Sequence, residues 1–471
     1  MRTVSKHFID GRFVDSHGQE AIDIHNPATG ELIGRSILGD AIDAERAIAA
    51  ASAAFPSWSK TSLEARKACL QRIAEALNER MDDLIAVTVA EYGAPASFSR
   101  MFNEQARDFM LLAKELLKAE HFEERSGNIT IRKVPVGVAG LLTPWNGSAW
   151  FIAGKTASAL AAGCTVVIKP SELSTLQSRI LMECFEKADL PAGVVNIVNG
   201  TGLIVGNAIT RSPQVQKISF TGSTAVGKQI NRDATETMKR VTLELGGKSP
   251  TVILDDADMG KAVQFALIAG LLNTGQACIA GTRILVPESR LEEAKTALKA
   301  GVEALTIGDL SHPATVIQPM VSKSHYERVQ NYIRKGIEEG AEILVGGLGK
   351  PEGFEVGNYV KPTIFVGVTN DMTIAQEEIF GPVLSVIAYR NDDEAVAIAN
   401  DVPYGLHGYV VGENLDRARG VADRIVAGRV MINRLFNDPA NPFGGFKMSG
   451  FGRELGVHGL NAYLETKTVY A

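Results

Sequence analysis

The feature that most constrains the fold is a series of short apolar β-like segments, each followed by a turn and a helix-like segment. A strand, a helix and a second strand in one sheet form a right-handed crossover, so this alternation predicts an α/β fold with mostly parallel sheets. The first series has candidate strands at residues 138–143, 165–169, 194–198, 217–221 and 240–245, and the second, after Ser249, at 251–254, 283–286, 364–368, 383–389 and 428–433. Two α/β domains meeting near residues 244–248 are therefore expected.

The segments outside these two series complete the expected architecture. Residues 41–117 are predicted to be helical because Ala-rich periodic stretches occupy 41–55 and 63–81. Residues 128–138 alternate β-branched and polar side chains, which favours an extended ribbon, and the β-rich tail at 461–471 could extend a neighbouring sheet.

Composition excludes several classes of protein. A chain of 471 residues exceeds the roughly 250–300 residues of a single core. Its 45% hydrophobic and 22% charged residues are typical of a soluble globular protein, and a net charge of −6 without like-charge blocks does not indicate a nucleic-acid or membrane partner. No signal peptide or membrane-spanning run is apparent, so a cytoplasmic location is expected.

Cysteine and histidine patterns do not indicate a metal site. The cysteines lack CxxC spacing, and the eight histidines form no HExxH motif. We therefore expect no metal and four free thiols, at Cys69, Cys164, Cys184 and Cys278.

Four polar or glycine-rich stretches could carry chemistry, each with a structural alternative. NGTGLIVG at 199–206 and FTGSTAVG at 220–227 could approach a phosphate, but neither is a GxGxxG fingerprint, and on glycine spacing alone ordinary strand-to-helix turns are the favoured alternative. Cys278, in GQAC, is a candidate nucleophile or a buried inert thiol. Glu244, in LELGGK, is a candidate base or an ion-pair partner, and Asn146, in TPWN, is a candidate oxyanion donor or a turn residue.

Seven motifs together resemble the aldehyde dehydrogenase superfamily over almost the whole chain. The separation of 34 residues between Glu244 and Cys278 is also similar to that of the family. In chain order the motifs are TPWN at 143–146, KPSE at 169–172, FTGSTAVG at 220–227, ELGGK at 244–248, GQAC at 275–278, EEIFGPV at 377–383 and PFGGFKMSGFGRE at 442–454.

The resemblance implies oxidation of an aldehyde to a carboxylic acid through a thioester on Cys278. Asn146 and the Cys278 backbone amide would then stabilise the oxyanion of the hemithioacetal. Glu244 would activate the water that hydrolyses the thioester, and Lys155 and Glu454 would assist proton relay.

The resemblance also implies NAD as the cofactor. Lys169 and Glu172 would hold the adenosine ribose, and the Glu172 carboxylate would repel the extra phosphate of NADP. Glu378 would hold the nicotinamide ribose beside Phe380. Trp145 and Ser223 would lie near the pyrophosphate, although Trp145 could instead be a packing residue. The complete set of expected cofactor-binding residues is Trp145, Lys169, Glu172, Gly222, Ser223, Gly227, Leu245, Glu378 and Phe380.

Three structural units follow from the resemblance: a dinucleotide-binding domain at 1–116 and 137–245, a catalytic domain at 246–455, and an oligomerisation element at 117–136 and 456–471. The fold expected is two parallel-sheet α/β domains, Rossmann-like and catalytic, plus a small β element. A homodimer or homotetramer is expected, with a small-molecule aldehyde as substrate.

One departure from the family and three alternative functions stay open. After TPWN the family commonly has Phe-Pro, whereas this chain has Gly147 and Ser148, so the substrate tunnel is either widened or refilled by Trp150. Ile279 and the loop at 434–441 are further expected tunnel residues. The alternative functions are an NADP-preferring semialdehyde dehydrogenase, a relative that transfers the acyl group to coenzyme A, and an inactive structural homologue.

Overall fold

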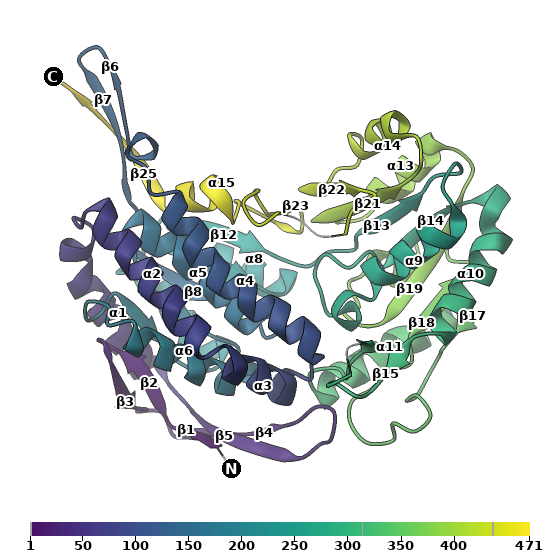
Figure 1. Cartoon of the computed structure of the whole chain (residues 1–471), viewed down its shortest axis with the longest axis horizontal. Helices are drawn as coiled ribbons and strands as arrows, with labels where there is room; N and C mark the ends of the chain where they lie inside the picture. The colour runs from purple at the N-terminus through teal and green to yellow at the C-terminus, as the bar shows by residue number, and fades with distance from the viewer. Residues whose placement is uncertain (1, 313, 436–437) are drawn as a thin grey trace.

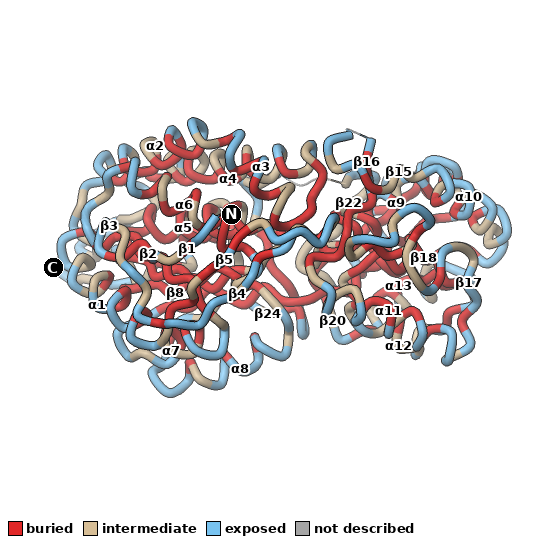
Figure 2. Tube along the Cα trace, turned by 90° about the horizontal axis from the view of Figure 1, so that it is seen from below, coloured by how far each residue is buried: buried red, intermediate tan, exposed pale blue. Residues whose placement is uncertain are grey.

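The computed structural model describes residues 2–312, 314–435 and 438–471. Two lobes, each built on its own sheet, lie side by side, and a small sheet carrying the C-terminus projects from the first lobe (Figure 1). The strands of both lobes are largely buried, while exposed residues lie mainly on the outer helices and loops (Figure 2).

The sheet of the first lobe has a parallel core of five strands. They are β8 (Val138–Leu142), β9 (Thr165–Lys169), β10 (Val195–Ile197), β11 (Lys217–Thr221) and β12 (Arg240–Glu244). Their spatial order is β12-β11-β8-β9-β10, so the chain moves outward from β8 in one direction and then returns to the other side to form β11. This reversal is a topological switch point, and such sheets bind ligands at the carboxyl ends of the strands that flank it.

Antiparallel strands extend both edges of this sheet. β2 (Lys6–Ile9) and β3 (Arg12–Asp15) continue it beyond β10, and β24 (Gly450–Phe451) pairs with β12. The helices of this lobe are α1 (Ala41–Trp58), α2 (Leu63–Glu79), α3 (Met81–Tyr92), α4 (Ala96–Glu115), α5 (Ser148–Ala162), α6 (Thr175–Lys187), α7 (Asn207–Arg211), α8 (Thr224–Thr235) and α15 (Gly456–Asn461).

The sheet of the second lobe has seven strands in the order β17-β18-β19-β14-β13-β21-β22, all parallel except β17. The strands are β13 (Pro250–Ile253), β14 (Arg283–Pro287), β17 (Glu342–Val345), β18 (Thr363–Val366), β19 (Val383–Tyr389), β21 (His407–Val411) and β22 (Arg429–Ile432). The helices are α9 (Met259–Gly270), α10 (Leu291–Glu303), α11 (Lys323–Glu338), α12 (Thr373–Gln376), α13 (Asp392–Asn400) and α14 (Leu415–Ala422). Two short pairs, β15 (Thr306–Ile307) with β16 (Thr315–Ile317) and β20 (Tyr404–Gly405) with β23 (Phe446–Lys447), complete the lobe.

The projecting sheet joins the expected ribbon to the C-terminal tail. β7 (Ile129–Pro135) lies between β6 (Glu123–Ser126) and β25 (Leu464–Tyr470), with both neighbours antiparallel. The tail therefore pairs with the ribbon of its own chain along seven residues of β25. The outer edges of β6 and β25 are not paired within the described residues.

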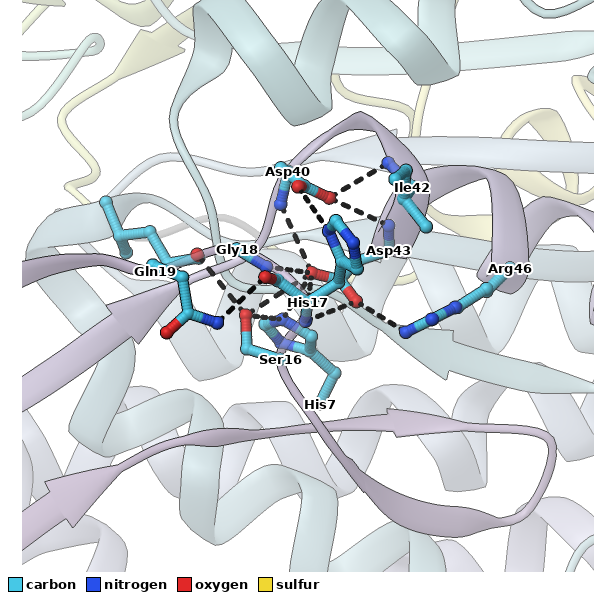
Figure 3. Close-up of polar contacts among 10 residues, drawn as sticks. His7, Ser16, His17, Gly18, Gln19, Asp40, Ile42, Asp43 and Arg46 are labelled. Atoms are coloured by element: carbon cyan, nitrogen blue, oxygen red, sulfur yellow. Dashed lines mark hydrogen bonds and ion pairs between the residues drawn. The ribbon is translucent and has the colours of Figure 1, made fainter.

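The N-terminal strands are tied to the first lobe by a buried carboxylate, Asp43, in the first turn of α1 (Figure 3). It accepts hydrogen bonds from the backbone nitrogens of His17 (3.0 Å) and Gly18 (3.1 Å) and lies 3.5 Å from His7 Nε2. Burial alone would raise the Asp43 pKa, but these contacts outweigh burial and hold the pKa well below its usual range. A separate three-stranded sheet completes this region, in the order β1 (Arg2–Val4), β5 (Leu32–Leu38) and β4 (Glu20–His25).

The predicted α/β class and mostly parallel sheets are confirmed, and all ten candidate strands are present within two residues of their expected bounds. The prediction of one helix over 63–81 was wrong, because α2 ends at Glu79 and α3 begins at Met81. Arg80 separates the two helices and stays outside both, with its guanidinium bonded to Asp83 and Glu183.

Candidate active site

Two cavities meet at Cys278, between the carboxyl edge of the first sheet and the amino edge of the second. One has a volume of about 820 Å³ and is mainly apolar, and the other has a volume of about 800 Å³ and includes charged groups. Asn146, Phe151 and Cys278 line both cavities. The thiol is therefore reachable from two sides, as a nucleophile serving two ligands would need to be.

Sheet topology explains why these residues converge. Asn146 follows β8 and Gly222 follows β11, the two strands that flank the switch point, while Glu244 ends β12. Cys278 precedes β14 and Glu378 precedes β19, so both lie at the amino edge of the second sheet. The carboxyl ends of one parallel sheet thus face the amino ends of another.

A left-handed turn positions the nucleophile candidate. After α9 the backbone adopts positive φ at Asn273 (55°), Thr274 (56°) and Gly275 (73°), and Cys278 follows. A Cβ on Gly275 would lie 2.1 Å from the carbonyl oxygen of Gly381, so no side chain fits at this position.

The junction between the lobes also approaches Cys278 closely. A Cβ on Gly247 would lie 2.3 Å from the Cys278 carbonyl oxygen. Glycine at this position therefore lets the strand connection that follows Glu244 pack directly against the backbone of Cys278.

Burial and two neighbouring carboxylates raise the pKa of Cys278. Desolvation is the largest cause, followed by the charges of Glu378 and Glu244. The thiol is consequently protonated at neutral pH unless a base takes its proton. Burial also raises the pKa of Cys164 to about 11 and of Cys184 to about 12, and neither residue lines the two cavities.

Asn146 is held beside the nucleophile by the same turn. Its Nδ2 donates to the Gln276 carbonyl oxygen at 2.9 Å, and Asn273 Nδ2 donates to the Asn146 carbonyl oxygen at 3.3 Å. A side-chain amide nitrogen carries two hydrogens. Since one of them is directed to Gln276, the second remains for a ligand in the cavity.

Glu244 is a buried carboxylate, with 2% of its surface exposed, and neither oxygen has a hydrogen-bond partner among the described residues. Burial raises its pKa well above the usual value, and the charge of Glu454 raises it further, while Lys155 opposes the shift. An unpartnered buried carboxylate with a raised pKa is suited to accept a proton.

Lys155, Ser219 and Glu454 form a connected polar group next to Glu244. Lys155 Nζ forms an ion pair with Glu454 Oε1 and donates to Ser219 Oγ at 2.9 Å, and Ser219 Oγ donates to Glu454 Oε1 at 2.7 Å. The charge influence of Glu454 and Lys155 on the Glu244 pKa shows that the group is electrostatically coupled to that carboxylate.

The second cavity brings together most of the expected cofactor-binding residues. Ser223 caps the N-terminus of α8 next to Gly222, and Glu378 Oε1 accepts a hydrogen bond of 2.9 Å from Gly247 N. The lining residues are Pro144, Trp145, Asn146, Phe151, Thr221, Gly222, Ser223, Glu244, Leu245, Gly246, Cys278, His325, Arg328, Glu378 and Phe380.

Glu378, Phe380 and Trp145 are fixed by their neighbours. A Cβ on Gly246 would lie 2.3 Å from Glu378 Oε2, so glycine lets the carboxylate approach the backbone. Burial raises the pKa of Glu378 to about 7. The Phe380 ring meets Trp145 edge-on at 5.5 Å, and the Phe380 carbonyl oxygen lies 2.7 Å from His325 Nε2.

Three expected cofactor-binding residues lie outside both cavities. Lys169 ends β9 and donates to Glu172 Oε2 at 3.0 Å, which places this pair at the carboxyl edge of the first sheet. A Cβ on Gly227, in α8, would lie 2.5 Å from the Leu245 side chain, so this glycine serves close packing of the helix against the end of β12.

The apolar cavity shows what occupies the space left by Gly147. A Cβ on Gly147 would lie 3.0 Å from the Phe102 ring, which comes from α4, and 3.5 Å from Phe151. Trp150 lines the same cavity and contacts the Phe102 ring at a centroid distance of 6.2 Å. The lining residues are Phe98, Met101, Phe102, Gln105, Asn146, Trp150, Phe151, Leu272, Asn273, Ala277, Cys278, Ile279, Leu435 and Phe443.

Sequence motifs identified neither the residues of α4 in this cavity nor His325 and Arg328 of α11. The α4 residues recur at intervals of three and four, which is the period of one helix face. Expected tunnel residues Ile279 and Leu435 line the cavity, and residues 436 and 437 of the expected loop lie outside the described residues. Within residues 2–312, 314–435 and 438–471, no cluster of three potential metal ligands occurs, and no helix could cross a membrane.

Comparison with known proteins identifies a single family. Residues 13–469 match the family model described as "Aldehyde dehydrogenase family". A variant of aldehyde dehydrogenase C from Pseudomonas syringae, solved with NAD+ and octanal, is 44% identical with a TM-score of 0.97 and covers 99% of this chain and 96% of its own. An aldehyde dehydrogenase from Mycobacterium tuberculosis, solved with NAD+, is 38% identical with a TM-score of 0.96, covering 100% and 98%. A betaine aldehyde dehydrogenase from Staphylococcus aureus, also solved with NAD+, is 35% identical with a TM-score of 0.95, covering 99% and 94%.

Proposed function

Because the chain belongs to the aldehyde dehydrogenase family, we propose that it oxidises an aldehyde to a carboxylic acid with NAD, through a thioester on Cys278. The observation that carries this proposal is the meeting of two cavities at one thiol, with an amide donor and an unpartnered carboxylate beside it.

The second cavity fits NAD. Gly222 and Gly246 line it at the carboxyl edge of the sheet, and Ser223 caps the N-terminus of α8, where a phosphate is favoured. Glu378 would bind the nicotinamide ribose, and Lys169 with Glu172 would bind the adenosine ribose, where the carboxylate disfavours a 2′-phosphate. Trp145, Phe380 and Leu245 would shape the walls, and Gly227 would let α8 pack against Leu245. Bound there, NAD would supply the acceptor for the electron pair that leaves the aldehyde carbon.

A negative charge on either Cys278 or Glu244 is more favourable than a negative charge on both, since the charge of a nearby carboxylate raises the pKa of the thiol. Passing the thiol proton to Glu244 therefore creates the thiolate without adding charge to the site. The thiolate sulfur then bonds to the aldehyde carbon, and the carbonyl oxygen becomes an oxyanion. The free N–H of Asn146 and the Cys278 backbone N–H would donate to it, which for one such donor lowers the barrier by about 3–4 kcal/mol.

Glu244 acts again after oxidation, once the thiol proton that it accepted has left it. The Lys155–Ser219–Glu454 group would carry that proton away, because Glu454 and Lys155 are electrostatically coupled to Glu244. The regained carboxylate takes a proton from the water that attacks the thioester carbon, the C–S bond breaks to release the acid, and Glu244 returns this second proton to the sulfur of Cys278. This hydrolytic route needs the base that a transfer to coenzyme A would not use.

We further propose the functional units expected from the sequence: dinucleotide binding by residues 1–116 and 137–245, catalysis by 246–455, and oligomerisation by 117–136 and 456–471. The two-sheet architecture and the projecting β25-β7-β6 sheet support this division, although β24 of the catalytic segment pairs with β12. Free edges on β6 and β25 would suit pairing with a second copy in a homodimer or homotetramer.

Replacement of the thiol tests the proposal. We expect Cys278→Ala to abolish NAD reduction with every aldehyde, because no covalent adduct can form. Cys184→Ala is the matched control, since this buried cysteine of α6 lies away from both cavities and its loss should leave turnover in place. The measurement is NADH absorbance in steady state, with NADP as a second acceptor. Full turnover by the Cys278→Ala protein would contradict the proposal.

A further inference from the structure

We propose that Arg429 is a positioning residue for the proposed reaction: it holds the loop that contacts Glu244 and keeps a positive charge beside that carboxylate. This inference rests on the proposed role of Glu244 in the chemistry at Cys278 and goes beyond it, because no step of that mechanism uses Arg429. The residue is not among those that line the two cavities, so it acts through Glu244 rather than on the aldehyde.

The start of β22 packs against the loop at 441–445, which contacts Glu244. Arg429 is the first residue of β22, and a Cβ on the preceding residue, Gly428, would clash with the Gly444 carbonyl oxygen. A Cβ on Gly444 would in turn lie 2.8 Å from Glu244 Oε1. Glycine at both positions therefore lets the second lobe approach the carboxylate with one loop residue, Gly444, between them.

The Arg429 side chain holds the same loop. Its Nη2 donates to the Pro442 carbonyl oxygen at 2.7 Å, and the guanidinium carbon lies 5.3 Å from the centroid of the Phe443 ring. A guanidinium at this distance is attracted to the face of an aromatic ring. Because Phe443 lines the apolar cavity, Arg429 supports a residue of the cavity wall without lining the cavity itself.

Arg429 is also one of the charges that oppose the effect of burial on Glu244. Burial raises the Glu244 pKa, and the charge of Glu454 raises it further. Three cations lower it: Lys155, Arg453 and Arg429. Lys155 forms an ion pair with Glu454, so the effects of these two charges on Glu244 oppose each other. Arg453 and Arg429 are then the cations left to favour the ionised carboxylate.

The groups that face Arg429 keep this charge constant over the pH range of an assay. Burial lowers the Arg429 pKa, and the charges of Glu244, Tyr409 and Asp438 oppose that shift, so the guanidinium stays protonated. On the adjacent strand, burial and then Arg429 lower the pKa of His407 to about 3, and burial raises the pKa of Tyr409 above its usual range. Neither of these two neighbours changes charge between about pH 5 and 9.

The test follows kcat for acetaldehyde oxidation with NAD across the rising limb of the pH profile. Without the positive charge, Glu244 should ionise at higher pH, so the limb should move to higher pH in both Arg429→Met and Arg429→Gln. We expect kcat on the limb to fall by about three- to tenfold and kcat on the plateau to change by less than about twofold. Glutamine still donates hydrogen bonds and methionine does not, so an equal displacement in both variants assigns the effect to the charge.

Two matched variants complete the test. Arg429→Lys keeps the positive charge at the same place and should keep the natural limb. Arg419→Met removes a positive charge from the exposed side of α14, where Arg419 pairs with Asp416, and should also keep it. All four variants are measured as complete proteins by NADH absorbance.

The outcomes separate this inference from the proposed function. A loss of kcat or a rise in KM by the same factor at every pH would overturn the inference, because it would assign Arg429 to support of the Phe443 loop alone. An equal displacement in Arg419→Met, or a natural protein without a rising limb, would also overturn it, while oxidation of aldehydes would stand. No NADH from any aldehyde would overturn the proposed function and the inference with it.

Discussion

Replacing Glu244 by glutamine should separate the catalytic role of this carboxylate from any structural one. Both oxygens are buried without a partner among the described residues, and burial raises the Glu244 pKa well above the usual value. Glutamine keeps the shape of the side chain but cannot accept a proton from water. Since a positioned general base contributes about 10²- to 10⁴-fold, steady-state turnover should fall by that factor.

The first turnover should survive if hydrolysis is the step that Glu244 governs. We expect a burst of NADH approaching one equivalent per subunit in stopped-flow measurements of Glu244→Gln, followed by slow turnover. The pH dependence should also change. In the natural protein the fraction of ionised Glu244 increases with pH up to its raised pKa, so turnover should rise by about tenfold per pH unit below that pKa. This rise should be absent from the variant.

Glu244→Gln should lower turnover without lowering the free energy of unfolding. A carboxyl group whose pKa is raised in the folded state binds a proton that the unfolded chain releases, so folding becomes less favourable as pH rises above about 4.3, the unfolded value. Each pH unit between the two pKa values costs about 1.4 kcal/mol, and glutamine removes this cost. The variant should therefore unfold at an equal or higher denaturant concentration, with a difference that grows with pH. A variant that loses stability, or that keeps turnover within fivefold of the natural protein, would refute the reasoning.

Two further substitutions test the oxyanion donor and the N-terminal carboxylate. Asn146→Ala should lower kcat by about 10²- to 10³-fold with little effect on cofactor binding, because it removes one donor; a loss below tenfold in steady-state assays would contradict that role. Asp43→Asn should lower the free energy of unfolding by about 2–3 kcal/mol at pH 7, because a donor group replaces an oxygen that accepts charge-assisted hydrogen bonds. Since the Asp43 pKa is depressed on folding, this difference should be present above about pH 4 and shrink as pH falls below it, as measured by urea unfolding. A difference independent of pH would count against charge-assisted hydrogen bonds as the cause.

The sequence predicted the parallel sheets because their strands are buried on both faces. Such strands appear as short apolar runs between turn residues, and β9, β11 and β19 occur at the expected bounds. The strand β21 (His407–Val411) was not among the candidates. Its burial comes from neighbours β13 and β22 in the sheet, which is information that a local pattern does not contain.

The site was predictable where one short segment provides both the chemistry and the turn that presents it. Asn146, Glu244 and Cys278 each lie in such a segment, at a strand end or before a strand. Their electrostatic state was not predictable in the same way. The pKa of Glu244 depends on burial and on Glu454, which follows it by 210 residues, so only the folded chain sets how that carboxylate responds to pH.

Substrate selection is the part of the site that sequence motifs could not supply. Gln105 and Phe102 belong to a helix whose pattern predicts only that one face is covered, and nothing in that pattern names Gly147 or Trp150 as the covering residues. Gly147 and Phe102 are 45 residues apart in the sequence, and only the fold brings the Phe102 ring against Gly147. The shape of the wall that meets the substrate is therefore set by how α4 packs against the loop that follows β8, and only the fold shows this packing.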